Sequence, residues 1–440
     1  MKKLQKLLLI APALLLWSCE NKTVRIYEAN SPKTISFEEW RATIPKLEPT
    51  SNTALSQPGK IYSFQNALYI NEKGKGVHIY NNSNPSNPEE IGFLEIHANL
   101  DIAIQGNVMY AGSYTDLLLF DVSNPLHPKY VGREENVFEF NINSIPEGYN
   151  ADLPVKNFNA QEEVVLSWEI ERVEEEINES NDAPDMGSEV MFRSDRDDEV
   201  FQPVSENRMM LMSAADASFS PRGTGMGGSM ASFTIMNNTI YVLDHNALKY
   251  ASLSNPTDLP NFEEMFLWRD VETLFPHENT LFIGTTTGML IYDIADDGTP
   301  TYLSAFEHWT GCDPVVVSDN KAYVTLSSGC GLNRNQMDVV DVSDLTNPRL
   351  IKSYTFNHPL GLGVDDNTLF LCDDNDGLKV FDVADSENID QNMIKHYSGI
   401  NAYDVIPFNN LLIMVGDDGV FQYNYSNPEN IIELSQIIVQ

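Results

Sequence analysis

The sequence predicts an all-β, seven-bladed β-propeller of four-stranded antiparallel blades, with a long insertion between blades two and three. The main observation is an internal repeat, often spaced by 41 residues, in which an asparagine precedes an apolar strand, a polar turn and a second apolar strand. Its seven copies begin at Asn66, Asn107, Asn238, Asn279, Asn320, Asn367 and Asn410. A repeat of this length that holds four short strands is typical of propeller blades.

The second copy shows how each unit divides into strands. Its apolar segments predict strands at Asp101–Gln105, Val108–Gly112, Leu117–Val122 and Lys129–Arg133. Gly, Asn, Asp and Pro residues separate these segments, as turns between short strands require. The Asn-Pro dipeptide after the third strand marks a turn, because proline cannot donate a ladder hydrogen bond. The alternating pattern excludes a helical solenoid, and an open β-solenoid is the structural alternative.

The N-terminus predicts export and lipid attachment. Three lysines precede an apolar run from Leu7 to Leu16, which is too short to span a bilayer. Leu16-Trp17-Ser18-Cys19 resembles the lipobox of bacterial lipoproteins, which implies that Cys19 carries the lipid. An ordinary secretory signal is the alternative. The expected location is the outer membrane, on its periplasmic or its surface side.

These features divide the chain into three parts. We expect a lipoprotein signal peptide at residues 1–18, a lipidated N-terminus and linker at 19–57, and the propeller at 58–440. The second half of the linker should bridge the anchor and the ring and pack on the propeller through Trp40.

Charge restricts the kinds of partner. The formal net charge is −37, and removal of the three lysines in residues 1–18 makes it −40. Such a field repels nucleic acid and anionic lipid headgroups and favours cationic or neutral ligands. Most of this charge is expected to serve solubility, and the protein is expected to be a monomer.

The repeat text is also recognisable. VHIYNNSNPSNP, LLLFDVSNPLHP, MDVVDVSDLTNP and LKVFDVADSEN resemble the LVIVD repeat of exported bacterial and archaeal β-propeller proteins. Segments such as GKIYSF, GGSMASFTI and QYNYSNPENI look like a lipoprotein branch of that family in Bacteroidetes-type bacteria. The resemblance runs from about Gly59 to the C-terminus, apart from the insertion. It implies a propeller on a lipid anchor and no settled activity.

Propeller geometry places the irregular features on one face, called the top face here, where the innermost strand of each blade starts. The insertion at 139–222, the enlarged loop at 329–336 and the linker at 308–313 all belong to this face. Insertions on one face of a repeat array usually mark its binding face.

The insertion differs in composition from the repeats. Residues 139–222 hold twenty acidic and six basic residues. Within them, Leu166, Trp168 and Ile170 alternate with polar residues, which predicts a strand or hairpin with one buried face. The polar stretch at 178–208 is expected to be mobile.

The cysteines of the propeller have two expected roles. Cys312 and Cys330 both fall in top loops of one blade, so we predict a disulfide that stabilises the fold by about 3 kcal/mol. Two free thiols are the alternative. Cys372 lies in a second-strand segment and is expected to be a small buried hydrophobe.

Candidate site residues come from the same map, since no nucleotide-binding glycine loop, zinc-protease, CxxC or serine-hydrolase motif is present. The candidate channel-mouth or ligand-binding residues are Asp101, Tyr114, Asp270, Trp309, Asp313, Tyr403 and Asp404. Asp101, Asp313 and Asp404 could together hold Ca²⁺ through their oxygens, or could accept hydrogen bonds from neighbouring blades. The Asp373–Gly377 segment resembles a fragment of a Ca²⁺ loop, although such residues also suit tight turns.

The leading interpretation is an envelope-anchored binding or scaffold propeller without catalytic residues. Its partner would be a protein, a peptide or a glycan at the top face. One alternative is a polysaccharide-acting hydrolase or lyase that uses Asp101, Asp313 and Asp404, and another is a purely structural surface protein. Paired carboxylates perform glycoside chemistry only at defined separations, which the sequence does not supply.

Overall fold

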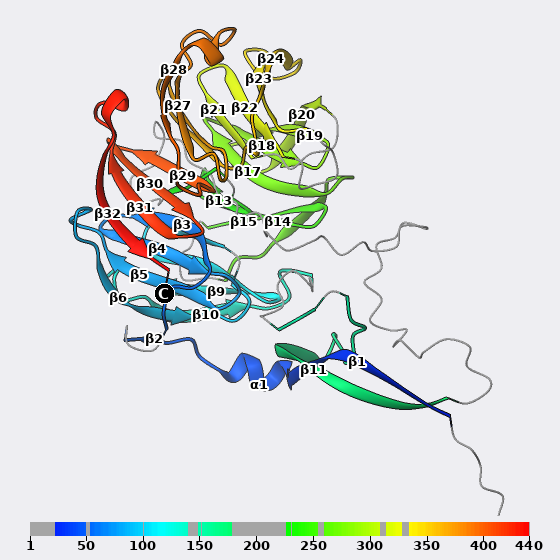
Figure 1. Ribbon diagram of the computed structural model, residues 1–440. Helices are drawn as coiled ribbons and strands as arrows, with labels where there is room; N and C mark the ends of the chain where they lie inside the picture. Colours follow the sequence, from blue (N-terminus) through cyan, green and yellow to red (C-terminus); the bar gives the residue numbers. More distant parts are fainter. Residues whose placement is uncertain are drawn as a thin grey trace, which may run out of the picture.

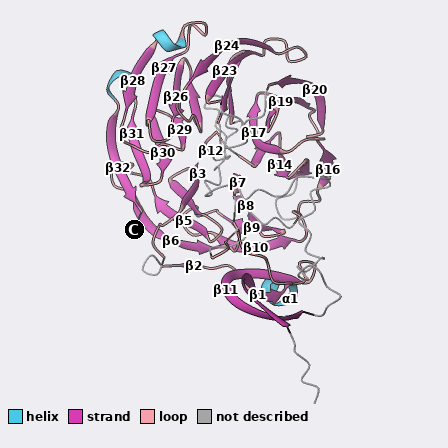
Figure 2. Ribbon diagram, turned by 45° about the vertical axis from the view of Figure 1, so that its right-hand side comes forward, coloured by secondary structure: helices cyan, strands magenta, loops and turns pink. Residues whose placement is uncertain are grey.

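The computed structural model describes residues 23–49, 53–99, 101–139, 148–150, 152–177, 226–229, 231–253, 259–308, 314–327 and 334–439. Seven four-stranded antiparallel units form a ring, which confirms the fold class predicted from the repeats (Figures 1 and 2). Blade I also carries the short strands β2 (Leu47–Glu48) on its outer side and β12 (Met226–Gly227) on its inner side.

The first four blades have these bounds. Blade I is β3 (Pro58–Phe64), β4 (Ala67–Glu72), β5 (Gly76–Asn81) and β6 (Glu89–Glu95). Blade II is β7 (Ile102–Gln105), β8 (Val108–Ser113), β9 (Asp116–Asp121) and β10 (Lys129–Glu134). Blade III is β13 (Phe233–Met236), β14 (Thr239–Asp244), β15 (Ala247–Ser252) and β16 (Glu263–Phe266). Blade IV is β17 (Val271–His277), β18 (Thr280–Thr285), β19 (Gly288–Ile294) and β20 (Pro300–Glu307).

The last three blades complete the ring. Blade V is β21 (Val315–Ser318), β22 (Lys321–Leu326), β23 (Gln336–Asp341) and β24 (Arg349–Thr355). Blade VI is β25 (Leu362–Asp365), β26 (Thr368–Cys372), β27 (Leu378–Asp382) and β28 (Met393–Tyr397), with the 3-10 turn η3 (Ile389–Gln391). Blade VII is β29 (Asp404–Phe408), β30 (Leu411–Gly416), β31 (Gly419–Asn424) and β32 (Ile432–Ile438), with η4 (Pro428–Asn430).

The repeated asparagine has the same role in every blade. It lies in the turn between the first two strands, and its carbonyl accepts a hydrogen bond from the residue that ends the third strand (blade IV) or follows it (the other blades). The N–H of Asn82 donates to Asn66 at 2.7 Å in blade I, and that of Tyr425 donates to Asn410 at 2.9 Å in blade VII. The residue before it has a positive φ, for example 53° at Gln65, as two-residue hairpin turns require.

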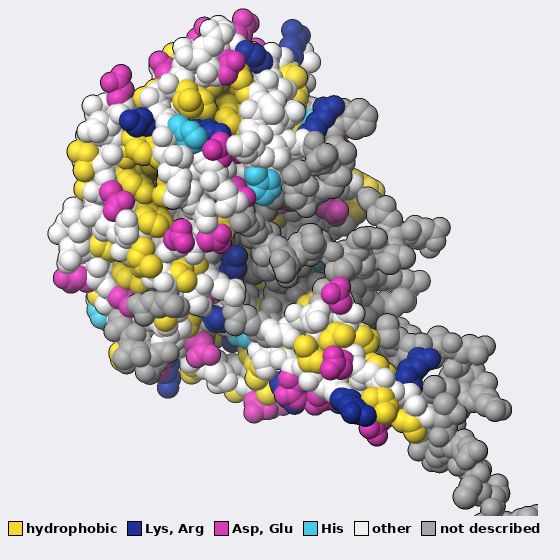
Figure 3. Space-filling view, in the orientation of Figure 1, with side chains coloured by type: hydrophobic (Ala, Val, Ile, Leu, Met, Phe, Trp, Pro, Cys, Tyr) yellow, Lys and Arg dark blue, Asp and Glu magenta, His cyan; other side chains and the backbone are white. Residues whose placement is uncertain are grey.

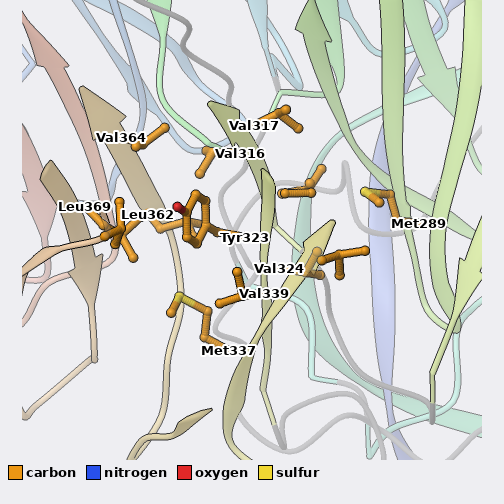
Figure 4. Packing of buried hydrophobic residues seen from close by; sticks show 14 of the residues in the cluster. Met289, Val316, Val317, Tyr323, Val324, Met337, Val339, Leu362, Val364 and Leu369 are labelled. Carbon is orange, nitrogen blue, oxygen red and sulfur yellow. The ribbon is translucent and has the colours of Figure 1, made fainter. Parts of the chain in front are cut away.

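Apolar clusters between blades hold the ring together. One cluster joins blades IV, V and VI through side chains such as Met289, Tyr323 and Leu369 (Figure 4). No strand from one end of the chain completes the blade at the other end, among the described residues. The ring closes instead through another apolar cluster, which packs blade VII against blade I. Buried Asn82 and Gln422 exchange two side-chain hydrogen bonds of 2.8 Å across that junction. Burial of apolar surface between sheets is therefore the main source of closure.

A separate unit, here called the side module, lies outside the ring beside blade II (Figures 1 and 2). It consists of the described parts of residues 23–42 and 148–177. Strand β1 (Thr23–Ser36) pairs antiparallel with β11 (Glu163–Ile177), and helix α1 (Phe37–Ala42) follows β1. Residues 23–42 thus form regular structure within the segment that the sequence suggested to be a linker.

Asn30 joins the two parts of the side module. It is fully buried, and its side-chain amide donates to the carbonyls of Asn150 at 2.6 Å and Leu153 at 3.1 Å. Its main chain also exchanges hydrogen bonds of 2.8 Å with Pro154 and Lys156. A buried amide needs such partners, so Asn30 fixes the N-terminal strand to the insertion.

The burial pattern predicted for the insertion strand is correct in only one of its three positions. Trp168 is buried and contacts the rings of Tyr149 and Phe158. Leu166 and Ile170, predicted to share its face toward the core, are 38% and 51% exposed. Strand β11 pairs with β1 and not with another part of the insertion. The rings of Tyr149 and Phe158 cover Trp168, whereas Leu166 and Ile170 stay exposed. The stretch at 178–208 lies outside the described residues.

Candidate functional site

The segment that follows the insertion, in the described part of residues 226–232, crosses the mouth of the central channel. Strand β12 pairs with the innermost strand β3 opposite Tyr62 and Ser63, and it lies inside the ring (Figure 2). The next described residues contact blades VII, VI and II in turn. Ser229 reaches Asp404 and Leu362, and Ser232 reaches Asp101. The channel mouth is therefore spanned by the protein's own chain.

Asp101 joins three blades at this crossing. It is 3% exposed, and its Oδ2 accepts from Lys60 Nζ of blade I at 2.9 Å. The same oxygen accepts from the main-chain N–H groups of Ser232 at 3.0 Å and Phe233 at 3.1 Å, while Oδ1 accepts from Ile102 N–H at 2.8 Å. All these partners belong to the chain, so this carboxylate acts as a structural acceptor.

Asp404 is enclosed even more tightly and is 1% exposed. Its Oδ1 accepts from the Ser229 hydroxyl at 2.8 Å and from the Ser229 N–H at 3.2 Å. A Cβ at either Gly228 or Gly361 would lie 2.4 Å from its carboxylate, so both glycines are needed for this close approach. Burial raises the pKa of Asp404 to about 7, against the opposing effect of the hydrogen bonds from Ser229.

The other candidate residues are scattered. Tyr114 is 6% exposed beneath helix α1, and Tyr403 is 8% exposed in the cluster between blades VII and I. Asp270 is exposed on the linker between blades III and IV. Trp309 and Asp313 lie outside the described residues. Of the seven candidates, the structure thus brings Asp101 and Asp404 to one place, the crossing at the channel mouth.

The predicted disulfide and lipid anchor involve residues beyond the described part of the chain. Cys312, Cys330 and Cys19 lie outside the described residues, so the disulfide remains a prediction that thiol titration of unfolded, unreduced protein would test. Cys372 is fully buried, as expected, and burial raises the pKa of its thiol.

Within the described residues, no group of three or more His, Cys, Asp or Glu side chains is arranged to hold a metal ion. The Asp373–Gly377 segment forms a tight turn, with Gly377 N–H donating to the Asp374 carbonyl at 3.0 Å. The Lys379 ammonium donates to Asp373 and, at 2.6 Å, to Asp376. The Lys379 ammonium group therefore pairs with two of the carboxylates in the segment that resembles a Ca²⁺ loop.

A buried ionic cluster fixes the side module to blade II. Asp116 is fully buried and accepts from Arg41 Nε at 2.9 Å and Nη2 at 2.8 Å, and from Arg133 Nη1 at 2.9 Å. It also accepts from the Asn136 N–H at 2.9 Å. Burial favours the neutral acid, but the hydrogen bonds from Arg41, Asn136 and Arg133 outweigh burial and lower the pKa of Asp116.

Aromatic packing adds to this attachment. Trp40 is 5% exposed and packs on Tyr114 with ring centroids 5.8 Å apart, as the sequence suggested for this tryptophan. The Arg133 guanidinium lies over the Trp40 ring at 4.3 Å from its centroid. A cation held over an aromatic face and also paired with a carboxylate is fixed in two directions. Helix α1 is therefore held firmly on blade II.

This attachment forms an open cleft of about 710 Å³ between helix α1, blade II and the insertion. Its lining comprises Ser36, Phe37, Glu38, Arg41, Thr115, Asn136, Glu139, Ala160, Gln161 and Glu162. The carboxylates of Glu38, Glu139 and Glu162 are on exposed residues. Among the described lining residues the basic one is Arg41, which already pairs with Asp116 and, at 2.7 Å, with Glu135. The cleft therefore favours a positively charged ligand.

None of the cleft residues was a candidate from the sequence. The cleft joins the N-terminal segment, a turn of blade II and the insertion, and no repeat pattern links these three parts. The sequence signal available for this region was Ser36, a helix-capping serine. Its side chain accepts a hydrogen bond from the Glu39 N–H at 3.1 Å at the start of α1. It indicates a helix but not where that helix docks.

Asp404 provides a test of the structural role of the channel-mouth carboxylates. Because its pKa is raised to about 7 in the folded state, its contribution to stability is present at pH below about 4 and is lost as the pH rises through 7. Asp404→Asn removes this titration and should raise the free energy of unfolding by about 4 kcal/mol at pH 8.5, roughly twice the gain expected at pH 5.5. Urea unfolding at both pH values measures this.

The exposed Asp418→Asn on the same blade is the control and should leave both unfolding curves unchanged. An equal effect of Asp404→Asn at the two pH values would contradict a raised pKa.

No helix among the described residues is long and apolar enough to cross a membrane.

Comparison with known proteins identifies the repeats. The family model of the LVIVD repeat matches residues 99–134 and 312–356, which correspond to blades II and V. No curated protein matches the chain. A solved protein from Lactobacillus plantarum is 9% identical with a TM-score of 0.52, over 87% of this chain and 97% of that one.

Two yeast structures are also similar. Sqt1 of Saccharomyces cerevisiae is 10% identical with a TM-score of 0.47, over 89% of this chain and 99% of its own. Hsv2 of Kluyveromyces lactis is 11% identical with a TM-score of 0.44, over 86% and 97%. At such identities a likeness concerns the fold alone. The chain thus carries LVIVD repeats and folds as a seven-bladed propeller.

Proposed function

We propose that this chain is an exported, lipid-anchored propeller that binds a protein partner without catalysing a reaction. The partner would insert a lysine- or arginine-containing segment into the cleft between the side module and blade II. The observation that carries the proposal is the uncompensated negative charge of that cleft. Its described lining includes three exposed glutamates and one arginine, and this arginine is already paired with two other carboxylates.

The volume of the cleft suits a side chain or a short peptide segment. A space of about 710 Å³ lies within the range of ordinary ligand sites. The exposed glutamates Glu38 and Glu162 come from the N-terminal segment and the insertion, while Glu139 follows blade II. A cation that enters the cleft would meet carboxylates from these three parts of the chain. Such charge complementarity contributes more to specificity and to the rate of association than to affinity.

The burial of the channel-mouth carboxylates argues against the polysaccharide-acting alternative. Asp101 and Asp404 were two of its three candidate acids, and both are buried and occupied by donors of the chain. A general acid or base must reach the substrate within hydrogen-bond distance. Binding outside the channel is therefore the better supported function, and it also gives the acidic insertion a role that a purely structural protein would not need.

The anchor belongs to the same proposal. Only three residues separate Cys19 from the start of strand β1 at Thr23. A lipid on Cys19 would therefore hold the side module near the membrane, at the outer membrane on its periplasmic or surface side. The resemblance to Bacteroidetes-type lipoproteins supports this location.

Charge removal tests the cleft. Pentalysine peptide should bind the wild-type protein, and the triple variant Glu38→Gln, Glu139→Gln, Glu162→Gln should bind it roughly tenfold more weakly. The reason is that each exposed charge contributes a few tenths of a kcal/mol or more to the attraction. Fluorescence anisotropy of labelled peptide at low and high salt measures this, and affinity should fall as salt rises.

A matched triple variant separates local from global charge. Glu89→Gln, Glu429→Gln, Glu433→Gln removes three exposed carboxylates of blades I and VII and changes the net charge equally. This control should bind pentalysine like the wild type. Equal weakening in the two triple variants would mean that general charge, and not the cleft, attracts the peptide.

The anchor is tested in cells. Cys19→Ser should move the protein from the membrane fraction to the soluble fraction and abolish labelling by radioactive palmitate. A variant that stays in the membrane fraction or still incorporates palmitate would contradict lipid attachment at Cys19.

A further inference from the structure

Trp268 is the most exposed large apolar side chain among the described residues, with 83% of its surface accessible. It lies on the linker between β16 and β17, which belongs to the top face. Its φ is 62°, in the left-handed region that bulky side chains rarely adopt. Strained residues of this kind concentrate at binding and catalytic sites. The chain thus holds an indole in water at a position that glycine would occupy with less strain.

The linker that carries Trp268 is held at both ends. Leu267 N–H donates to the Asn246 carbonyl at 2.7 Å, and Val271 N–H donates to the His245 carbonyl at 3.0 Å. Phe266 contacts the Trp268 ring edge to face at 4.8 Å between centroids. The indole is therefore presented in a fixed position, which lowers the entropy lost when a ligand stacks on it.

The surroundings of Trp268 are polar. Exposed Asp270 follows two residues later on the same linker. Arg269 lies between them and pairs with exposed Glu307 at 3.3 Å. Phe266, whose ring contacts Trp268, is 47% exposed and adds part of a phenyl ring to the apolar surface of the indole. On the face of the molecule seen in Figure 3, charged side chains are dispersed among the described residues.

We propose that Trp268 and Asp270 form a binding site for a neutral glycan, beyond the cationic segment proposed for the cleft. One face of a pyranose ring carries mainly C–H groups, which stack on an indole, and its hydroxyl groups donate to a carboxylate. Among glycans, the acidic surface repels anionic polymers and so favours neutral sugars. A protein hot spot would sit at the centre of a larger packed apolar patch, and a membrane contact would lack these acids.

The test uses the folded protein without residues 1–18 and five neutral hexasaccharides: cellohexaose, xylohexaose, mannohexaose, maltohexaose and laminarihexaose. Isothermal titration calorimetry should detect binding of at least one of them. Trp268→Ala should weaken that binding at least tenfold, and Asp270→Asn should weaken it severalfold. Trp268→Phe should retain part of the affinity, because a smaller aromatic face remains.

Two further variants keep the test decisive. Tyr302→Ala removes another aromatic side chain, 56% exposed on β20, and should leave glycan affinity unchanged. Trp268→Gly should abolish binding without lowering the melting temperature, since glycine relieves the positive φ. The proposal is overturned if no hexasaccharide binds, if binding survives Trp268→Ala, or if Trp268→Ala weakens pentalysine binding instead, which would assign this tryptophan to the protein-binding surface.

Discussion

Buried carboxylates that accept main-chain N–H groups hold the crossing segments of the top face in place. Glu72 accepts from the N–H groups of Ser56 and Gln57 at 3.0 and 2.9 Å. Burial favours its neutral form, but His78, with Nε2 3.6 Å away, and the hydrogen bonds from Ser56 and Gln57 lower its pKa to about 2. The same arrangement recurs with other partners at Asp101, Asp116, Asp244, Asp373 and Asp404. A buried amide without an acceptor is costly, so these contacts determine where each segment lies.

This constraint decides where a ligand has access. Asp116 and Asp244 hold the chain that enters the insertion through Asn136 and Glu139, and the two carboxylates at the channel mouth hold the segment that leaves it. The insertion therefore forms one wall of the cleft beside blade II, and the segment that follows it crosses the channel mouth. The acids that stay exposed, such as Glu139 in the lining of the cleft, are the ones accessible to a partner.

The repeats made the blades predictable because each turn depends on residues within one unit. The four strands predicted for the second copy agree with β7, β8, β9 and β10 to within one residue at each end. The side module was not predictable in this way, since β1 and β11 are separated by more than a hundred residues and neither belongs to a repeat. Trp268 lacked a signal too, because exposure and a positive φ are properties of the folded chain. Asp101 and Asp404 were located correctly at strand starts, but their burial depends on Ser229 and Ser232 from outside the repeats.

The most direct test of this account is hydrogen exchange of Asp116→Ala compared with the wild type. Loss of the carboxylate leaves Arg41 and Arg133 without their buried partner, at a cost of about 3–5 kcal/mol, which should undock helix α1 from blade II. The account predicts faster exchange of the amides of α1 and of residues 135–139, unchanged exchange in blade VII, and loss of pentalysine binding. Wild-type protection of α1, or an equal loss of protection in all seven blades, would contradict it.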